Sequence, residues 1–277
     1  MIKTVLITGG NSGIGKATVA GLAQKGWQVV FTARNHQKAE SVKREIIAKS
    51  GNDKVDYLIV DLTSLKQVRD CAETYKKRFE KLDVLINNAG VCLPEQRITE
   101  DGLEESFQIN HLSHFILTNL LLDILEKSDD PRIINLSSAA HKAGRVDSDY
   151  IQGMKPYNSF RTYADTKLYN ILFTLELADK LKETGITVNA LHPGVVGTNF
   201  GKEFGGIFNF LYTIGKTFMI TPEKGAKTSL YLADSEAVKN ITGKYFVRCK
   251  PVDLKNPHIT PENRRKLWEK SMELSSL

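Results

Sequence analysis

Residues 4–15 read TVLITGGNSGIG, and this stretch decides the fold that the chain is expected to adopt. Its first four residues are apolar or β-branched, which predicts a buried strand, and helical spacing begins at Ile14. A glycine-rich turn between such elements presents backbone N–H groups and a helix N-terminus to an anion, and glycine lets a pyrophosphate approach closely. An ordinary strand-to-helix turn is the alternative, but the location after the first strand favours a cofactor site at Gly9, Asn11, Ser12, Gly13, Ile14 and Gly15.

Apolar, β-rich runs alternate with helical patterns along the whole chain. The runs predict strands at 4–7, 28–32, 56–59, 84–87, 132–136, 187–191 and 244–247. Helices are predicted at 14–25, 37–49, 65–79, 102–125, 163–184 and 222–233. Short apolar strands separated by helices are typical of parallel strands with helices on both faces. We therefore predict an α/β fold, with one domain over residues 1–277 built on a Rossmann-type, doubly wound, seven-stranded parallel sheet.

Composition and charge narrow the classes of protein. Hydrophobic residues make up 41% and charged residues 25% of the chain, which is ordinary for a globular protein. The net charge is +6, but the basic residues are dispersed and no nucleic-acid motif accompanies them, so we expect no nucleic-acid partner. Three widely spaced cysteines argue against a disulfide framework and a zinc site, and no cluster completes a metal site with His111 and His114.

The N-terminal sequence and the longest apolar stretch bear on location. No signal peptide or anchor helix precedes the strand predicted at 4–7. The apolar stretch at 207–220 is interrupted by Asn209 and Lys216 and is too short to span a bilayer. We therefore expect a cytoplasmic protein without a transmembrane anchor, and contact of this stretch with a membrane surface is left open.

The end of the second predicted strand selects the cofactor. Sites that prefer NAD usually place Asp or Glu there, bonded to the ribose 2′-hydroxyl, whereas an Arg accommodates a 2′-phosphate. This chain has Arg34 and Asn35 at that point and no acid. A guanidinium can hold a phosphate in a bidentate fork, so NADP is the expected cofactor, although a surface Arg at a strand end is the simpler alternative.

Tyr163 and Lys167 are four residues apart and so lie on one face of the helix predicted at 163–184. A cation beside a phenol favours the phenolate and lowers the tyrosine pKa from about 10 toward neutrality. The pair alone is a weak signal, because any amphipathic helix can contain it by chance. Here it follows the glycine-rich turn and the Ser137-Ser138 pair, and the combination favours a catalytic site over a packing tyrosine.

These features together resemble the short-chain dehydrogenase/reductase family, and most closely its retinol dehydrogenase branch, along essentially the whole chain. Residues 8–15 match T-G-x-x-x-G-I-G, residues 87–90 match N-N-A-G, and residues 163–167 match Y-x-x-x-K. Further matches are Asp61-Leu62 after the third strand, Asn110 on a helix, Ser138 after the fifth strand and the turn at Pro193-Gly194. The separation of 25 positions between Ser138 and Tyr163 also resembles the retinol dehydrogenase branch.

The resemblance implies a role for each matched residue. Tyr163 would be the general acid and Ser138 would donate a hydrogen bond to the substrate carbonyl oxygen. Lys167 would lower the Tyr163 pKa and bind the nicotinamide ribose, and Asn110 would hold a water that links Lys167 to solvent. Besides Tyr163 and Lys167, the cofactor contacts that it implies are Asp61, Leu62, Asn88, Ala89, Gly90, Pro193, Gly194, Val196 and Thr198.

The function implied is NADP(H)-dependent reduction, or formation, of the carbonyl of a lipophilic aldehyde, ketone or retinoid. The domain would consist of a cofactor half at about 1–135 and a catalytic and substrate half at about 136–277. The aromatic-rich segment at about 199–222 resembles a lid over the substrate. For the stretch at 207–220, a shallow membrane contact and plain core are the other interpretations. The alternative function is a non-catalytic NADP-binding regulator or scaffold of the same fold, although such proteins usually lose Tyr or Lys of the pair.

The resemblance also implies a homodimer or homotetramer that associates through the helices predicted at 102–125 and 163–184. Five apolar residues of these helices could serve either that interface or the core of the chain itself: Leu117, Leu120, Leu121, Phe173 and Leu177.

Overall fold

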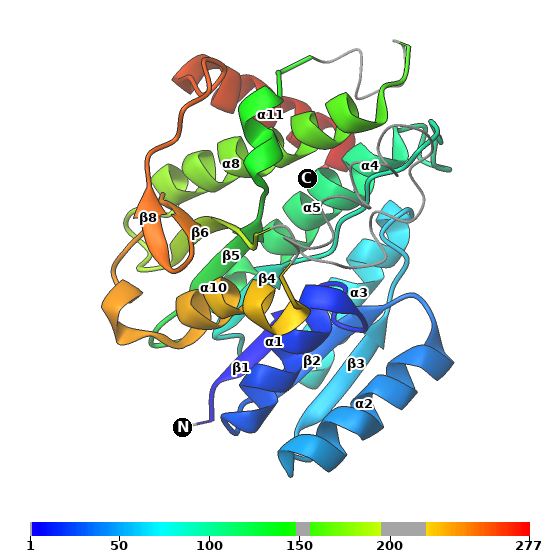
Figure 1. The fold of residues 1–277 in the computed structure, drawn as a ribbon, viewed down its shortest axis with the longest axis vertical. Helices are drawn as coiled ribbons and strands as arrows, with labels where there is room; N and C mark the ends of the chain where they lie inside the picture. Colours follow the sequence, from blue (N-terminus) through cyan, green and yellow to red (C-terminus); the bar gives the residue numbers. More distant parts are fainter. Residues whose placement is uncertain (1, 148–155, 195–219) are drawn as a thin grey trace.

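The structure, a computed structural model, describes residues 2–147, 156–194 and 220–277. A single sheet runs through this part of the chain in the order β3-β2-β1-β4-β5-β6-β7-β8 (Figure 1). From β3 to β7 all neighbours are parallel, so the predicted α/β, Rossmann-type fold is confirmed. The strands are β1 (Thr4–Ile7), β2 (Gln28–Ala33), β3 (Val55–Ile59), β4 (Val84–Asn87), β5 (Arg132–Leu136), β6 (Thr187–His192), β7 (Tyr245–Val247) and β8 (Lys250–Val252).

The prediction of a seven-stranded, wholly parallel sheet is wrong at its edge, because β8 adds an eighth strand antiparallel to β7. Two residues, Arg248 and Cys249, connect these strands, with φ of 51° and 62°. Positive φ at both central residues is the geometry of a tight hairpin turn that usually contains Asn-Gly or Gly-Gly. Since neither residue is a usual turn former, the sequence carries no hairpin signal here.

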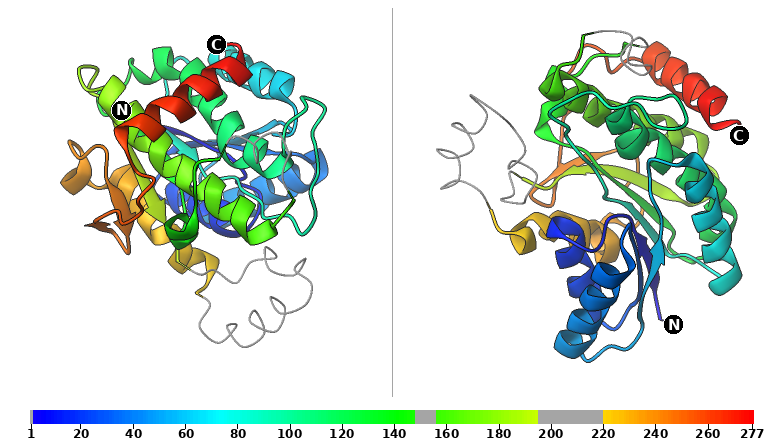
Figure 2. Two further views of the ribbon diagram at one scale, coloured as in Figure 1. Left: turned by 90° about the horizontal axis from the view of Figure 1, so that it is seen from above. Right: turned by 90° about the vertical axis from the view of Figure 1, so that its right-hand side faces the viewer.

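Two layers of helices cover the sheet (Figure 2). The helices α1 (Gly13–Gln24), α2 (His36–Ser50) and α10 (Pro222–Asp234) pack on one face, and their buried residues form one apolar cluster with the sheet. The other face carries α3 (Leu65–Arg78), α5 (Ser113–Leu120) and α8 (Ser159–Lys180), which form a second cluster. Strands that are buried on both faces are apolar along nearly their whole length, which explains why they can be recognised from the sequence.

The helix predicted at 102–125 is broken in the structure. Gly102 has a φ of +76°, so the first turn starts only at α4 (Glu105–Phe107), where the Glu104 carboxylate accepts the Phe107 N–H at 2.7 Å. A π-helical turn, η1 (Gln108–Leu112), separates α4 from α5, and α6 (Leu122–Leu125) follows. π-Helical turns often occur at functional positions, and this one contains Asn110.

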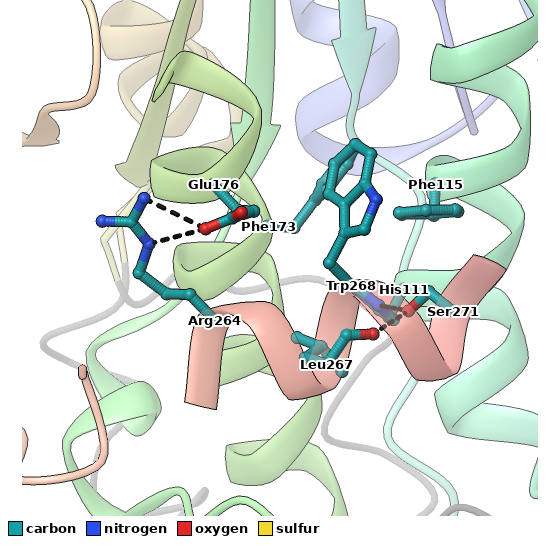
Figure 3. Close-up of a pocket in the computed structure, with 8 residues that line it drawn as sticks. All are labelled: His111, Phe115, Phe173, Glu176, Arg264, Leu267, Trp268 and Ser271. Carbon is teal, nitrogen blue, oxygen red and sulfur yellow. Dashed lines mark hydrogen bonds and ion pairs between the residues drawn. The ribbon is translucent and has the colours of Figure 1, made fainter. Parts of the chain in front are cut away.

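A C-terminal helix that was not predicted, α11 (Pro261–Ser275), packs against α5 and α8 (Figure 3). The Trp268 ring lies edge-on to Phe115 at 4.9 Å and stacks on Phe173 at 6.1 Å between ring centres. At one end of the same contact, the Arg264 guanidinium pairs with Glu176 at 3.1 Å. The helix therefore covers an apolar stripe that α5 and α8 would otherwise present to solvent.

Five apolar residues were predicted to serve either an intermolecular interface or the core of the chain, and in the structure they belong mainly to the core. Leu117, Leu121, Phe173 and Leu177 are at most 3% exposed, and Leu120 is partly buried against the same cluster. In the part of the chain that the structure describes, no helix combines the length and the apolar character needed to cross a membrane.

The α11 contact predicts a stability change. We expect Trp268→Ala to lower the free energy of unfolding by about 2 kcal/mol, because a half-buried aromatic side chain leaves a gap between Phe115 and Phe173. Lys266→Ala, on the exposed side of the same helix, should change it by less than about 0.5 kcal/mol. Urea unfolding of both variants measures the difference, and equal effects would contradict the packing role of Trp268.

Candidate active site

A cleft of about 900 Å³ opens where the strands end. Its lining follows the carboxyl end of every parallel strand from β1 to β6, with residues 9, 11–15, 32–35, 60–62, 88–91, 136–138 and 193–194. The cleft includes the point where β1 pairs with β4 and the strand order reverses. Ligands of open α/β sheets bind at such a switch point, so the fold itself indicates this cleft as the site.

The glycine-rich turn forms one end of the cleft and is shaped to admit an anion. Gly9 and Gly13 have positive φ, of 65° and 52°, and a Cβ added at Gly15 would collide with the Gly9 carbonyl. Ser12 precedes α1 but its side chain caps no N–H group, and the first turn of α1 contains no acidic residue. The N–H groups and the partial positive charge of this helix end are therefore available to a phosphate, which fits a dinucleotide.

Hydrogen bonds from β4 hold this turn in place. The side chain of Asn88 donates to the Thr8 carbonyl at 2.7 Å, and the Thr8 hydroxyl accepts the backbone N–H of Asn88 and of Ala89, each at 2.9 Å. On the β2 side, Gly9 N–H donates to the Thr32 hydroxyl at 3.1 Å. The carboxyl ends of β1, β2 and β4 are thus joined into one rigid edge.

The end of β2 supplies basic side chains. Arg34, Asn35 and Lys38 all line the cleft, and Arg34 and Lys38 are exposed. The Asn35 side-chain oxygen Oδ1 accepts the Lys38 N–H at 2.8 Å and so caps α2. Within the described ranges, neither Arg34 nor Lys38 has an ion-pair partner, so two free cations flank a helix N-terminus. This arrangement suits a phosphate.

Tyr163, Lys167 and Ser138 meet in the cleft. The Lys167 ammonium lies 5.5 Å from the centre of the Tyr163 ring and donates to the Leu136 carbonyl at 3.3 Å. Ser138 begins the 3₁₀ turn η2 (Ala139–Ala143), and its hydroxyl is hydrogen-bonded to Tyr163. The neighbouring Ser137 hydroxyl donates to the Lys167 carbonyl at 2.7 Å, which attaches α8 to the end of β5.

Burial dominates the electrostatics of these groups. It raises the pKa of Tyr163 to about 12, while the hydrogen bond with Ser138 acts in the lowering direction. It lowers the pKa of Lys167 to about 8. The direction for Tyr163 is opposite to the one that the Tyr–Lys pair predicts, because removal from water disfavours the phenolate more than the neighbouring groups favour it.

Asn110 is not in the cleft wall but directly behind it. Its side chain accepts the Val91 N–H at 2.7 Å and donates to the Val91 carbonyl at 2.8 Å and to the Thr166 hydroxyl at 3.0 Å. A Cβ added at Gly90 would lie 3.1 Å from the Lys167 ammonium and 3.3 Å from the Asn110 side-chain oxygen. Asn110 therefore joins the loop after β4 to α8 beside Lys167.

The cleft brings together most of the residues predicted for the site. Those that line it are Gly9, Asn11, Ser12, Gly13, Ile14, Gly15, Arg34, Asn35, Asp61, Leu62, Asn88, Ala89, Gly90, Ser138, Tyr163, Lys167, Pro193 and Gly194. Val196, Thr198 and nearly all of the segment predicted as a lid at 199–222 lie outside the described residues.

Other lining residues were not among the predicted site residues. They are Thr32, Ala33, Lys38, Val60, Val91, Ile109, Leu136, Ser137 and Pro222. For Lys38 the sequence carried a signal that could have predicted its place in the cleft, because it is a cation one turn after the helix cap Asn35. For Ile109 it carried none, since only the packing of distant segments brings this residue to the cleft, and Pro222 is the last residue of the segment predicted as a lid at about 199–222.

Comparison with known proteins agrees with this geometry. The family model described as short chain dehydrogenase matches residues 3–205. Retinol dehydrogenase 13 of Homo sapiens is 42% identical over 281 residues, which cover 99% of this chain and 85% of that protein. Retinol dehydrogenase 14 of Homo sapiens is 42% identical over 286 residues, which cover 96% and 84%.

Solved structures show the same fold. An uncharacterized protein from Mycobacterium paratuberculosis has a TM-score of 0.79 and 30% identity, with 99% of this chain and 93% of that one covered. A short chain dehydrogenase from Escherichia coli CFT073, complexed with NADPH, has a TM-score of 0.70 and 22% identity over 90% and 97%, a likeness that concerns the fold. The family match, the relatives and the arrangement of the cleft agree, and the chain belongs to the short-chain dehydrogenase family, in its retinol dehydrogenase-like branch.

Proposed function

We propose that this protein is an NADP(H)-dependent oxidoreductase that reduces, or forms, the carbonyl of a lipophilic aldehyde, ketone or retinoid. The observation that carries the proposal is the meeting of Ser138, Tyr163 and Lys167 in the cleft that also contains the glycine-rich turn. One cleft thus combines a phosphate-binding helix end with a phenol, a hydroxyl and an ammonium group. The relatives at 42% identity are named retinol dehydrogenases, which supports the same class of reaction.

The proposed roles follow from the positions of the side chains. In the reductive direction NADPH supplies the hydride when it is bound. Tyr163 donates the proton to the carbonyl oxygen, and general acid help of this kind is worth roughly 10²–10⁴-fold. Ser138 donates a hydrogen bond to the same oxygen and stabilises the negative charge that develops there. Lys167, with a pKa of about 8, is mostly charged at neutral pH, and its charge favours the phenolate that Tyr163 becomes.

The preference for NADP over NAD rests on the end of β2. An acidic side chain at this point would hold a ribose 2′-hydroxyl and repel a phosphate, whereas Arg34 provides a planar fork that can bind a phosphate with two hydrogen bonds. Lys38 lines the cleft on the next turn of the chain and adds a second positive charge. Both cations lie near the capped N-terminus of α2, which also favours an anion.

The proposals for the lipophilic substrate and for the protein's organisation rest on the relatives and on the sequence. The names of the relatives point to a retinoid or a similar apolar carbonyl compound, and the aromatic-rich segment at 199–222 is proposed to cover it. We propose a single domain over 1–277, a cytoplasmic location and association as a homodimer or homotetramer. Because α11 covers part of α5 and α8, such an association would have to use the parts of these helices that α11 leaves exposed.

The second candidate function is that of a non-catalytic NADP-binding regulator or scaffold. It would need the cleft and the phosphate-binding end but not the proton donor. The hydrogen bond between Ser138 and Tyr163 and the placement of Lys167 in the same cleft favour the enzyme, since a binding protein gains nothing from this combination.

Removal of the Tyr163 hydroxyl separates these two functions. We expect Tyr163→Phe to lower kcat at least about 100-fold, because the general acid is lost, while the Kd for NADPH changes less than about twofold. Tyr169→Phe is the matched control, since this tyrosine is on the same helix but donates to the Asp147 carbonyl at 3.4 Å and does not line the cleft. Undiminished turnover in Tyr163→Phe would refute the assignment of the acid.

The cofactor assignment is tested at Arg34. We expect Arg34→Ala to weaken NADPH binding at least about tenfold, because a charge-assisted hydrogen-bonded pair is lost, and to leave NADH binding nearly unchanged. Arg44→Ala is the control, because Arg44 is exposed on α2 and pairs with Glu40 instead. Equal affinity of the wild-type protein for NADH and NADPH would overturn the preference.

The substrate class is tested with a panel of carbonyl compounds. NADPH oxidation is followed with retinal, a medium-chain aldehyde, a steroid ketone, a quinone and a sugar aldehyde, and each assay is repeated with NADH. We expect turnover of the apolar compounds with NADPH. A clear preference for charged or sugar-like carbonyls would contradict the lipophilic substrate.

A further inference from the structure

His114 connects the cofactor-binding end of the cleft with its catalytic end, but it has neither a catalytic nor a cofactor-binding role in the proposed function. It lies on α5, one turn after Asn110, and is only 2% exposed. Its Nε2 atom is 2.9 Å from the Thr8 hydroxyl, and its Nδ1 atom is 3.2 Å from the backbone oxygen of Asn110. One imidazole therefore contacts both the residue that opens the glycine-rich turn and the residue behind the catalytic lysine.

The bonds at Thr8 determine the direction of the first contact. A hydroxyl has one donor and can accept two hydrogen bonds. The Thr8 oxygen already accepts two, from the backbone N–H of Asn88 and of Ala89, each at 2.9 Å. The Thr8 proton must therefore point to His114, so that Nε2 of the imidazole is the acceptor.

The direction of the second contact follows from the first. If Nε2 accepts, a neutral imidazole carries its proton on Nδ1, and this atom faces the Asn110 carbonyl, which can only accept. Burial lowers the pKa of His114 to about 3, and the Lys167 charge acts in the same direction, so the neutral form persists at neutral pH. The hydrogen bonds run one way, from the Thr8 hydroxyl through the imidazole to the Asn110 carbonyl.

Asn110 extends this chain to α8. Its side-chain amide holds both backbone groups of Val91 and the hydroxyl of Thr166, the residue before Lys167. Thr8 and Asn110 are fully buried, so water does not compete for these bonds. A shift of His114 would therefore displace both the turn that binds the cofactor and the support of Lys167.

We propose that His114 is a positioning residue that couples the cofactor-binding turn to Asn110 and Lys167 through two hydrogen bonds of fixed direction. The inference rests on the proposed function for its catalytic consequence, but not for the hydrogen-bond chain itself. No proton is transferred along the chain. The imidazole acts as a rigid spacer whose acceptor faces the cofactor end and whose donor faces the catalytic end.

His111 is a second buried histidine that can be compared with His114. It lies on the π-helical turn η1, just before α5, and is as buried as His114, but its Nε2 faces the Ser271 hydroxyl at 2.9 Å (Figure 3). Ser271 donates its own proton to the Leu267 carbonyl at 2.8 Å, so its oxygen must accept from His111. The two histidines are therefore expected to be opposite tautomers, His114 with the proton on Nδ1 and His111 with the proton on Nε2.

The first experiment measures these tautomers in the wild-type chain. Nitrogen-15 NMR of the histidine-labelled protein distinguishes protonated from unprotonated ring nitrogens, and the signals are assigned by their loss in His114→Gln and His111→Gln. We expect a proton on Nδ1 of His114 and on Nε2 of His111, with neither ring titrating through neutral pH. A proton on Nε2 of His114, or a ring that titrates there, would overturn the proposal whatever the enzyme does.

The second experiment separates the two bonds of His114. The amide oxygen of Gln can reach the position of Nε2, whereas the amide nitrogen of Asn can reach that of Nδ1, so each variant keeps one bond. We expect His114→Gln to bind NADPH within about twofold of wild type but to lose roughly tenfold in kcat at saturating cofactor, because it loses the bond to Asn110. His114→Asn loses the bond to Thr8 instead, and its Kd for NADPH should rise about tenfold while kcat stays within about twofold.

His111→Gln should change kcat and the NADPH Kd by less than about twofold, since His111 contacts α11 and not the cofactor turn. If both His114 variants keep the wild-type kcat and NADPH affinity, or only melt at a lower temperature, the coupling role is wrong. A wild-type protein that turns over none of the carbonyl compounds would refute the proposed function, yet the tautomers and the NADPH affinities would still test the hydrogen-bond chain.

Discussion

The arrangement of the whole site depends on one constraint, which is that polar groups buried at the carboxyl ends of β1 and β4 must find partners inside the protein. Thr8 shows how closely this is met. Its carbonyl accepts the Asn88 side chain, and its hydroxyl serves two backbone N–H groups and one imidazole. Because these bonds have fixed directions, the turn that follows β1 has one position relative to β4. A loop held only by apolar contacts would tolerate several.

The same constraint fixes the positions of α5 and α8 relative to the strands of the sheet. The Asn87 side chain on β4 donates to Thr118 on α5 at 2.9 Å and to Asn135 on β5 at 2.8 Å. Asn135 in turn donates to Thr174 on α8 at 2.9 Å. These bonds cross an otherwise apolar layer, where a one-turn slip of either helix would leave several buried amides without partners. They therefore fix where α5 presents Asn110 and where α8 presents Tyr163 and Lys167.

Much of the fold could be predicted because parallel strands buried on both faces must be apolar and helices between them must be amphipathic. The glycine-rich turn could also be recognised from the sequence, since only glycine adopts the positive φ of Gly9 and Gly13 without strain. Where the prediction was wrong, the cause was a local geometry that leaves no compositional trace. The Arg248-Cys249 hairpin turn uses residues that rarely adopt positive φ, and the π-helical turn at 108–112 interrupts a sequence that looks like one helix. The helix α11 shows only a thin apolar stripe, which becomes meaningful once α5 and α8 are there to receive it.

By itself, the sequence determined the class of fold, the glycine-rich turn, the presence of Arg34 instead of an acid at the end of β2 and the spacing of Tyr163 and Lys167, because each depends on residues close together in the chain. The tertiary structure decided what these residues experience. Burial in the assembled cleft raises the pKa of Tyr163 and lowers that of Lys167. This effect cannot be inferred from the spacing of the two residues along a helix. The tertiary structure also decided that Asn110 lies behind the cleft wall and that His114 joins it to Thr8, 106 positions away. Hydrogen-bond partners across such separations follow from which polar groups the packed layers bring together and shield from water, and that is a property of the folded chain.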